Sequence, residues 1–154
     1  MKHYLFLVCL ALISTNTVAL EAPQGSKYDN RIQHVHYNPD EVVSIYAYTG
    51  LGSQIVFSPE EKIIDVGSGF SDGWEFTNRR NILYIKPKSV KIGEGEEEQV
   101  IPPTAPAWDT NVLLATNKRL YAFDLFLIKE KKRSALSNNN KVSYRIKFLY
   151  PETT

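Results

Sequence analysis

The feature that most constrains the fold is a succession of short segments rich in β-branched and aromatic residues, separated by turn signals. Such segments are typical of β-strands, and clusters of Gly, Pro, Asn and Ser are typical of the turns between them. Eight segments of this kind occupy much of the chain: residues 41–48, 54–57, 62–67, 74–77, 81–87, 111–116, 119–128 and 142–150. Short strands at this spacing make a sandwich or a barrel, and we expect an all-β fold, a single β-sandwich domain of about eight mostly antiparallel strands.

The segment 119–128 is apolar on both of its faces. Alternation predicts four core residues on one face and three apolar residues around a single acid on the other: Tyr121, Phe123, Leu125 and Leu127, opposite Leu120, Ala122, Phe126 and Asp124. Apolar side chains on both faces indicate a strand covered on both sides or a face that meets another protein. We favour a central strand covered on both sides.

The first 19 residues have the pattern of a secretory signal peptide. Lys2 precedes an apolar run from Tyr4 to Ile13, and the segment ends in the small-x-Ala pattern Thr17-Val18-Ala19. We therefore expect cleavage after residue 19 and a β-sandwich domain over residues 20–154. The only cysteine, Cys9, lies in the predicted signal, so disulfides and thiolate metal sites are excluded from the processed chain. Export without disulfides fits a bacterial periplasm at least as well as the outside of an animal cell.

The charge balance argues against nucleic-acid binding. Lys2 is the only charged residue of the predicted signal, so the remainder carries 17 basic and 17 acidic residues. A domain that holds phosphate backbones needs a basic excess, and we expect no direct nucleic-acid contact. The basic run at 129–133 is interpreted as a solvated turn that blunts a strand edge.

One segment breaks the strand pattern. Residues 88–110 pass through an acidic Gly/Glu run into a proline cluster that a regular strand or helix cannot accommodate, which predicts a long exposed loop. It is either a tolerated surface insertion or an arm that docks a partner through Trp108 or the prolines.

The sequence offers little for catalysis. His34 and His36 are separated by one residue, so they would share a face if this segment were a strand, but no further His or Cys follows to complete a metal site. Glu60 and Glu61 follow a turn without an apolar pocket in view, and the Ser residues lack a G-x-S-x-G context. We therefore expect no enzyme, no catalytic residue, no cofactor and no metal.

A series of short motifs runs in order along the chain: Asp29-x-Arg31-Ile32, Tyr37-x-Pro39, Ile55-x-Phe57, Glu61, Gly69, Trp74, Asn81-x-Leu83-x-Ile85-Lys86-Pro87, Thr110-Asn111, Thr116 and Arg119-x-Tyr121-x-Phe123-x-Leu125. In this order, behind a signal peptide, they resemble the N-terminal half of the TrbG/CagX-type subunit of type IV secretion and conjugation channels, the ninth VirB-class component. The chain ends at Thr154, where full-length relatives continue into a second β domain. We therefore expect a form that lacks the C-terminal domain.

The resemblance implies a structural subunit of a periplasmic and outer-membrane core complex, which contributes to the ring through which DNA or protein effectors pass. It implies a ring oligomer whose partners are a large inner-membrane-spanning channel subunit and a full-length paralogue or a small lipoprotein. The motif residues are expected to be mainly structural, and the core or interface candidates are Phe57, Trp74, Leu83, Ile85, Pro87, Asn111, Arg119, Tyr121, Phe123, Leu125 and Trp108.

An alternative function is a secreted β-sandwich module that binds peptide or carbohydrate. Such a module would present exposed aromatic rings on its loops, and Trp108, Tyr46 and Tyr48 are the candidates.

Overall fold

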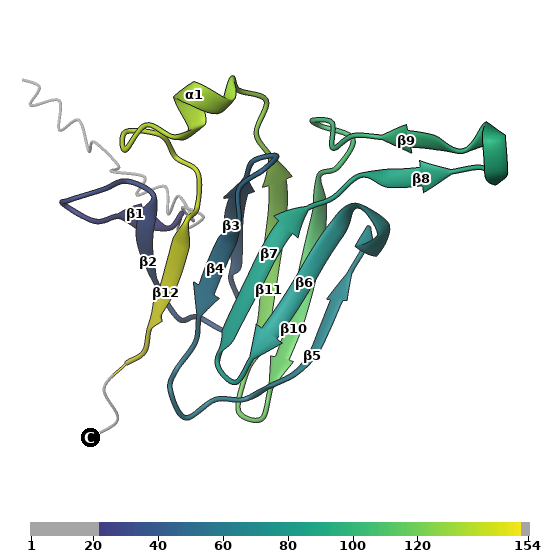
Figure 1. Cartoon of the computed structure of the whole chain (residues 1–154). Coiled ribbons are helices and arrows are strands. Elements are labelled where there is room, and N and C mark those ends of the chain that lie inside the picture. Colours follow the sequence, from purple (N-terminus) through teal and green to yellow (C-terminus); the bar gives the residue numbers. More distant parts are fainter. Residues whose placement is uncertain (1–21, 152–154) are drawn as a thin grey trace, which may run out of the picture.

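The computed structural model of the chain describes residues 22–151, so the predicted signal peptide at 1–19 lies outside the described residues. Two sheets pack face to face, and a two-stranded ribbon projects from them (Figure 1). The strands are β1 (Gln24–Gly25), β2 (Ile32–His36), β3 (Val42–Ala47), β4 (Ser53–Val56), β5 (Ile63–Ser68), β6 (Trp74–Arg79), β7 (Ile82–Pro87), β8 (Val90–Ile92), β9 (Gln99–Ile101), β10 (Thr110–Thr116), β11 (Leu120–Leu127) and β12 (Arg145–Leu149). The described residues also form three short helices: η1 (Ser71–Gly73), η2 (Gly95–Glu97) and α1 (Lys132–Ala135).

The larger sheet has the strand order β1-β2-β12-β4-β7-β6, and the smaller has the order β3-β11-β10-β5. The hairpins β6–β7 and β10–β11 are antiparallel, whereas β3 pairs with β11, and β12 with β2 and β4, in parallel. The predicted all-β sandwich with mostly antiparallel pairing is confirmed. The eight predicted segments correspond to β3–β7 and β10–β12, while β1, β2, β8 and β9 were not predicted.

The core lies between the two sheets. Strands of both sheets contribute alternate side chains to it, as the period of two requires. Phe57 and Phe148 stack with ring centroids 5.6 Å apart, and Phe123 lies edge-on to Phe148 at 6.0 Å. Burying side chains of this size stabilises a fold by roughly 1.5–3 kcal/mol each, so these rings contribute much of the contact between the sheets.

The outer face of the smaller sheet is open. β11 is a central strand between β3 and β10, and its predicted core set is buried. Its opposite face is not covered, because Leu120 is 72% exposed and Asp124 is also exposed. The expectation of cover on both sides was therefore wrong. On the neighbouring β10, Leu113 is 56% exposed on the same face, which leaves an apolar surface free in the described part of the chain.

The last strand is shorter than predicted. Residues 142–144 precede β12 and leave the alternating pattern, since Val142 and Ser143 are both fully buried. The Ser143 backbone amide donates to the Tyr46 carbonyl at 2.7 Å, and its hydroxyl donates to the Gln33 side-chain oxygen at 3.0 Å. The chain thus contacts both sheets here before it enters β12.

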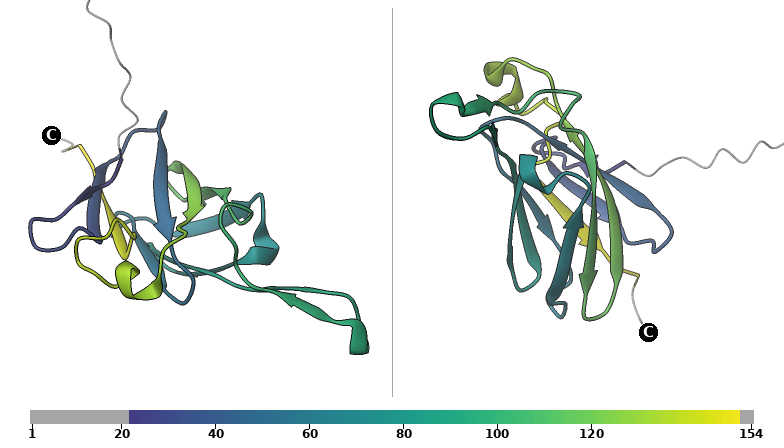
Figure 2. Two further views of the ribbon diagram at one scale, coloured as in Figure 1. Left: turned by 90° about the horizontal axis from the view of Figure 1, so that it is seen from above. Right: turned by 90° about the vertical axis from the view of Figure 1, so that its right-hand side faces the viewer.

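The segment 88–110, expected as an exposed loop, contains the antiparallel pair β8 and β9. Gly93 and Gly95 have φ values of 88° and 61°, which other residues rarely adopt, and they turn the chain into η2. We call residues 88–101 the arm. It extends away from the sandwich, as Figure 1 and the left view of Figure 2 show. The basic run at 129–133, expected as a turn at a strand edge, instead leads into α1.

Candidate functional site

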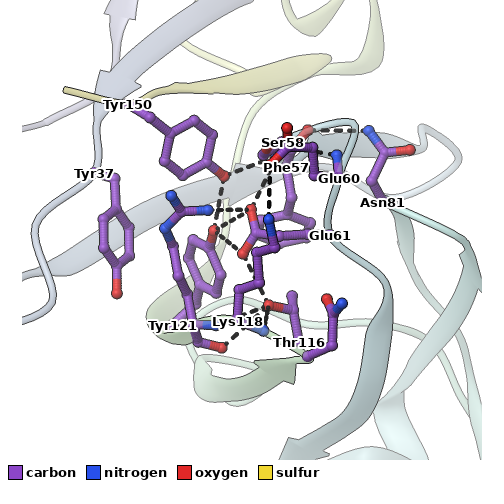
Figure 3. Close-up of polar contacts among 12 residues, drawn as sticks. Tyr37, Phe57, Ser58, Glu60, Glu61, Asn81, Thr116, Lys118, Tyr121 and Tyr150 are labelled. Carbon is purple, nitrogen blue, oxygen red and sulfur yellow. Dashed lines mark hydrogen bonds and ion pairs between the residues drawn. The ribbon is translucent and has the colours of Figure 1, made fainter. Parts of the chain in front are cut away.

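A buried carboxylate lies at the end of the sandwich where β10 turns into β11 (Figure 3). Glu61, in the connection between β4 and β5, is only 2% exposed. Its Oε1 accepts hydrogen bonds from the Thr116 and Tyr121 hydroxyls, both at 2.8 Å, and its Oε2 accepts one from the Ser58 amide at 3.1 Å. We call Glu61, Thr116, Arg119, Tyr121 and Tyr150 the Glu61 cluster.

Arg119 covers this carboxylate from the solvent side. Its Nη1 lies 3.1 Å from Oε2 of Glu61, and its side chain is 28% exposed. The guanidinium carbon lies 4.2 Å from the ring centroid of Tyr150 and 5.4 Å from that of Tyr37. The aromatic faces and the carboxylate together fix the guanidinium, which is a cation–π arrangement as well as an ion pair.

The cluster has a definite protonation state. Burial opposes ionisation of Glu61, but the hydrogen bonds from Thr116, Tyr121, Tyr150 and the Ser58 amide outweigh it and lower the pKa of the carboxyl. Burial, followed by the neighbouring hydroxyl and carboxylate, raises the pKa of Tyr121, and burial likewise raises that of Tyr150. Glu61 is therefore ionised at neutral pH and both phenols remain protonated.

This arrangement connects the two sheets. Thr116 and Tyr121 belong to the smaller sheet, whereas Tyr150 follows β12 of the larger one. The Tyr121 and Tyr150 hydroxyls lie 2.7 Å apart, and the Ser58 amide donates to Tyr150 at 2.9 Å. Both carboxylate oxygens are occupied by donors of the chain itself, so Glu61 holds the sheets together and is not placed to act as a general base.

A second cluster lies at the opposite end, at the base of the arm. The indole nitrogen of Trp74 donates to the Trp108 carbonyl at 2.9 Å, and that of Trp108 donates to the carbonyls of Gly73 at 3.0 Å and Lys88 at 3.1 Å. Phe70 meets the Trp108 ring edge-on at 5.3 Å. Trp108 is only 5% exposed, so it anchors the arm internally and is not an exposed docking residue.

Ten of the eleven sequence candidates fall into three settings, and Asn111 lies apart from them. Arg119 and Tyr121 belong to the Glu61 cluster, and Phe57 packs on Tyr121 with centroids 4.5 Å apart. Trp74 and Trp108 form the second cluster, and Pro87 is buried opposite Trp74 in the β6–β7 register. The remaining buried candidates lie in the core between the sheets: Leu83, Ile85, Phe123 and Leu125. Asn111 is exposed, and its side-chain oxygen accepts from the Gly69 amide at 3.2 Å.

Within residues 22–151, no group of three or more His, Cys, Asp or Glu residues is arranged to hold a metal ion. His34 and His36 lie exposed on one face of β2. None of the helices in the same range has the length and apolar character needed to cross a bilayer.

A shallow pocket of about 350 Å³ lies on the outer face of the smaller sheet. It is lined mainly by apolar side chains of β10 and β11, together with Pro39 and Asp65. Leu113 and Leu120 both line it and are 56% and 72% exposed. Apolar side chains exposed on one sheet face are typical of a surface that contacts another protein.

Comparison with known proteins gives these features a context. The sequence profile of the CagX family, described as conjugal transfer protein, matches residues 30–154. The chain belongs to the CagX family. It is 42% identical over 151 residues to the type IV secretion system protein virB9 of Brucella abortus biovar 1, an alignment covering 98% of this chain and 50% of that protein.

Two further relatives of this CagX-family chain have the same pattern of coverage. The type IV secretion system protein PtlF of Bordetella pertussis is 41% identical over 143 residues, covering 92% of this chain and 51% of that protein. The type IV secretion system protein virB9 of Bartonella henselae is 30% identical over 156 residues, covering 96% and 47%. The chain thus spans about half the length of the curated relatives it matches.

The role of Glu61 was not predicted from the sequence. Glu61 and Thr116 are part of the motif series, but the sequence around Glu61 indicates no apolar pocket, whereas the carboxylate is buried among aromatic rings. One signal for this role was present in the sequence: the motif Arg119-x-Tyr121 places a cation and a phenol at alternate positions. When such groups are buried, they need an acidic partner to accept their hydrogen bonds. Nothing in the sequence placed that partner 58 positions before Arg119 in the chain.

Proposed function

We propose that this chain is a structural subunit of a type IV secretion core complex in the bacterial periplasm, where it contributes to a ring through which DNA or protein effectors pass. The observation that carries the proposal is the match to the CagX family over residues 30–154, with relatives named as type IV secretion system proteins. Its work in such a complex is to form contacts, and it has no catalytic activity.

Two features of the described residues support a scaffolding role. Glu61, the most deeply buried carboxylate of the site, has all its hydrogen-bonding capacity used within the chain, which suits a rigid body. The outer face of the smaller sheet offers exposed Leu113 and Leu120 to a neighbouring protein. Rigidity together with an exposed apolar face is what a repeated structural subunit requires.

The partners in this proposal are a large inner-membrane-spanning channel subunit and a full-length paralogue or a small lipoprotein. The chain is processed after residue 19 and operates in the envelope close to the outer-membrane core complex. It makes no direct contact with nucleic acid, in keeping with nearly balanced charge of 18 basic and 17 acidic residues.

The proposal is tested by a mild-detergent pull-down of the tagged chain from its own cell envelope, with bound proteins identified by mass spectrometry. We expect recovery of the large channel subunit or a longer CagX-family relative. Recovery of the chain alone, at monomer size, would contradict the structural-subunit function.

The alternative binding module is not favoured. Its main candidate, Trp108, is buried at the base of the arm. Tyr46 is half-buried and stacked on Phe126 with centroids 5.4 Å apart, and Tyr48 is also half-buried. The aromatic rings proposed for a ligand are therefore engaged within the fold.

A further inference from the structure

The arm is an unusual element for a sandwich of this size. Only its base is held by the core, where Val90 and Ile101 are partly buried. Farther out, Ile92 is 53% and Val100 is 59% exposed, and both strands have an open edge. A two-stranded hairpin standing alone in water is marginally stable, so this arm has the properties of an element completed by another surface.

The far end of the arm is strongly acidic. Residues 93–98 contain Glu94, Glu96, Glu97 and Glu98 and no basic residue. Of these, only Glu98 forms an ion pair within the described chain, with Lys91 at 3.6 Å and largely exposed. Gly93 is five positions after Lys88, so the acidic end stands on the order of 17 Å from the base of the arm at 3.4 Å per residue.

A complementary basic surface occurs elsewhere on the same chain. Residues 129–133 carry Lys129, Lys131, Lys132 and Arg133 with the single acid Glu130, and all five are exposed. None of the four cations forms an ion pair among residues 22–151. Leu136, which follows α1 directly, is 48% exposed and gives this basic segment an apolar neighbour, as Ile92 and Val100 do for the acidic end.

The two surfaces are placed so that they cannot meet within one molecule. The arm and α1 both lie at the end of the sandwich opposite the β10–β11 turn, but the arm points away from α1 (Figures 1 and 2). Two different patches directed to opposite sides are the requirement for a head-to-tail contact, in which each copy offers one patch to the preceding copy and the other to the next.

We propose that the arm of one copy docks on the basic segment of the next copy, with its acidic end against residues 129–133 and its exposed apolar side chains against Leu136. The proposal rests on the structural-subunit function and specifies which surfaces join neighbouring copies. The contact orders the arm and gives the assembly its direction. Because opposite charges at an exposed interface are screened by ions, the contact weakens as salt is added.

The test is disulfide cross-linking of the full chain in its native envelope. The only natural cysteine is Cys9, in the predicted signal, so the pair Glu96→Cys and Lys132→Cys provides the only thiols of the processed chain. We expect a ladder of linked multimers under mild oxidation, at most dimers from either single-cysteine variant, and fewer multimers as salt is raised.

Charge reversal then tests the chemistry of the contact. In the two-cysteine chain, Glu94→Lys with Glu97→Lys is expected to reduce the ladder at least about tenfold, since like charges then face each other across the contact. Adding Lys131→Glu and Arg133→Glu restores opposite charges and the ladder. The matched reversal Asp40→Lys with Glu60→Lys, at exposed acids near the Glu61 cluster at the opposite end of the sandwich, leaves the ladder unchanged.

The outcomes separate this inference from the proposed function. If the cysteine pair gives no ladder while the channel subunit is still recovered with the chain, the arm contact is refuted and the function stands. If the ladder forms and responds to charge reversal but no secretion component is recovered, the contact stands and the function fails. A ladder insensitive to charge reversal also refutes the proposed pairing.

Discussion

Replacing Glu61 by glutamine tests whether the Glu61 cluster holds the two sheets together. The amide keeps the shape of the carboxylate but has one acceptor oxygen where two now accept from Thr116, Tyr121 and the Ser58 amide. If the oxygen stays toward Thr116, the Arg119 guanidinium loses its acceptor, and the partly buried Ser58 amide keeps only the Tyr150 hydroxyl. Hydrogen bonds to a charged group contribute about 1.5–3 kcal/mol each, and a partly exposed ion pair up to about 1 kcal/mol. We therefore expect a loss of about 2–4 kcal/mol in the free energy of unfolding.

The pH dependence of this loss has a definite sign. Because the fold lowers the pKa of Glu61 below its ordinary value of 4.5, the unfolded chain binds a proton more readily than the folded chain does. The stabilisation by Glu61 is therefore fully present above pH 4.5 and is lost as the pH falls through the lowered pKa. Urea unfolding of the wild type and Glu61→Gln, followed by tryptophan fluorescence, should give a difference that is constant near neutral pH and shrinks below pH 4.5.

The neighbouring residue supplies the control. Glu60 lies next to Glu61 in the chain but is exposed, and its carboxylate pairs with Lys118 at 2.7 Å on the surface. Exposed ion pairs contribute little to stability, so Glu60→Gln should unfold close to the wild-type urea concentration. If Glu61→Gln unfolds at the same urea concentration as Glu60→Gln, or if its deficit persists unchanged into acid, the cluster does not join the sheets as argued.

Three further predictions concern packing, and each is checked by thermal or urea unfolding. Trp108→Ala should cost about 3–5 kcal/mol, because it leaves a large cavity at the base of the arm; a cost below 1 kcal/mol would mean that the indole is not part of the core. Gly73→Ala should cost about 1–3 kcal/mol, since its Cβ would lie 2.5 Å from Nε1 of the Trp108 indole, whereas Gly52→Ala has open space and should be nearly neutral. On β10, replacing the buried Leu114 by Ala should lower the free energy of unfolding by about 2–5 kcal/mol, whereas replacing the neighbouring exposed Leu113 should lower it by less than about 0.5 kcal/mol. Equal losses would contradict the assigned faces of that strand.

Local pattern was sufficient to predict the strands that bury one face. Each predicted segment alternates apolar and polar residues, or is bounded by Gly, Pro or Asn, and these signals act within a few residues. β2 was missed because its sequence Ile-Gln-His-Val-His is mostly polar. Gln33 nevertheless occupies a core position, since Ser143 provides a hydrogen-bonding partner from 110 residues away. A buried polar side chain of this kind is recognisable only once its partner is placed.

The parallel pairings could not be predicted for a related reason. β12 pairs with β2 and β4, and β11 pairs with β3, across long stretches of sequence, and turn signals do not indicate such long-range contacts. The burial of Trp108 could not be predicted for the same reason. The prolines before it indicated an exposed loop, whereas its burial depends on contacts with Gly73 and Trp74, more than thirty residues earlier. Its position is a property of the assembled sandwich.

The burial of Trp108 also determines what the arm can do. A single indole nitrogen donates to the carbonyl of Gly73, just before β6, and to that of Lys88, where the arm begins. The first residue of the arm is thereby fixed to the sandwich, and the Lys88 amide also donates to the Gly73 carbonyl at 2.9 Å. An arm on a free linker would sample many directions and pay a large entropic cost on docking. An arm fixed at its base presents its acidic end to one side only, and a head-to-tail contact between identical copies depends on that restriction.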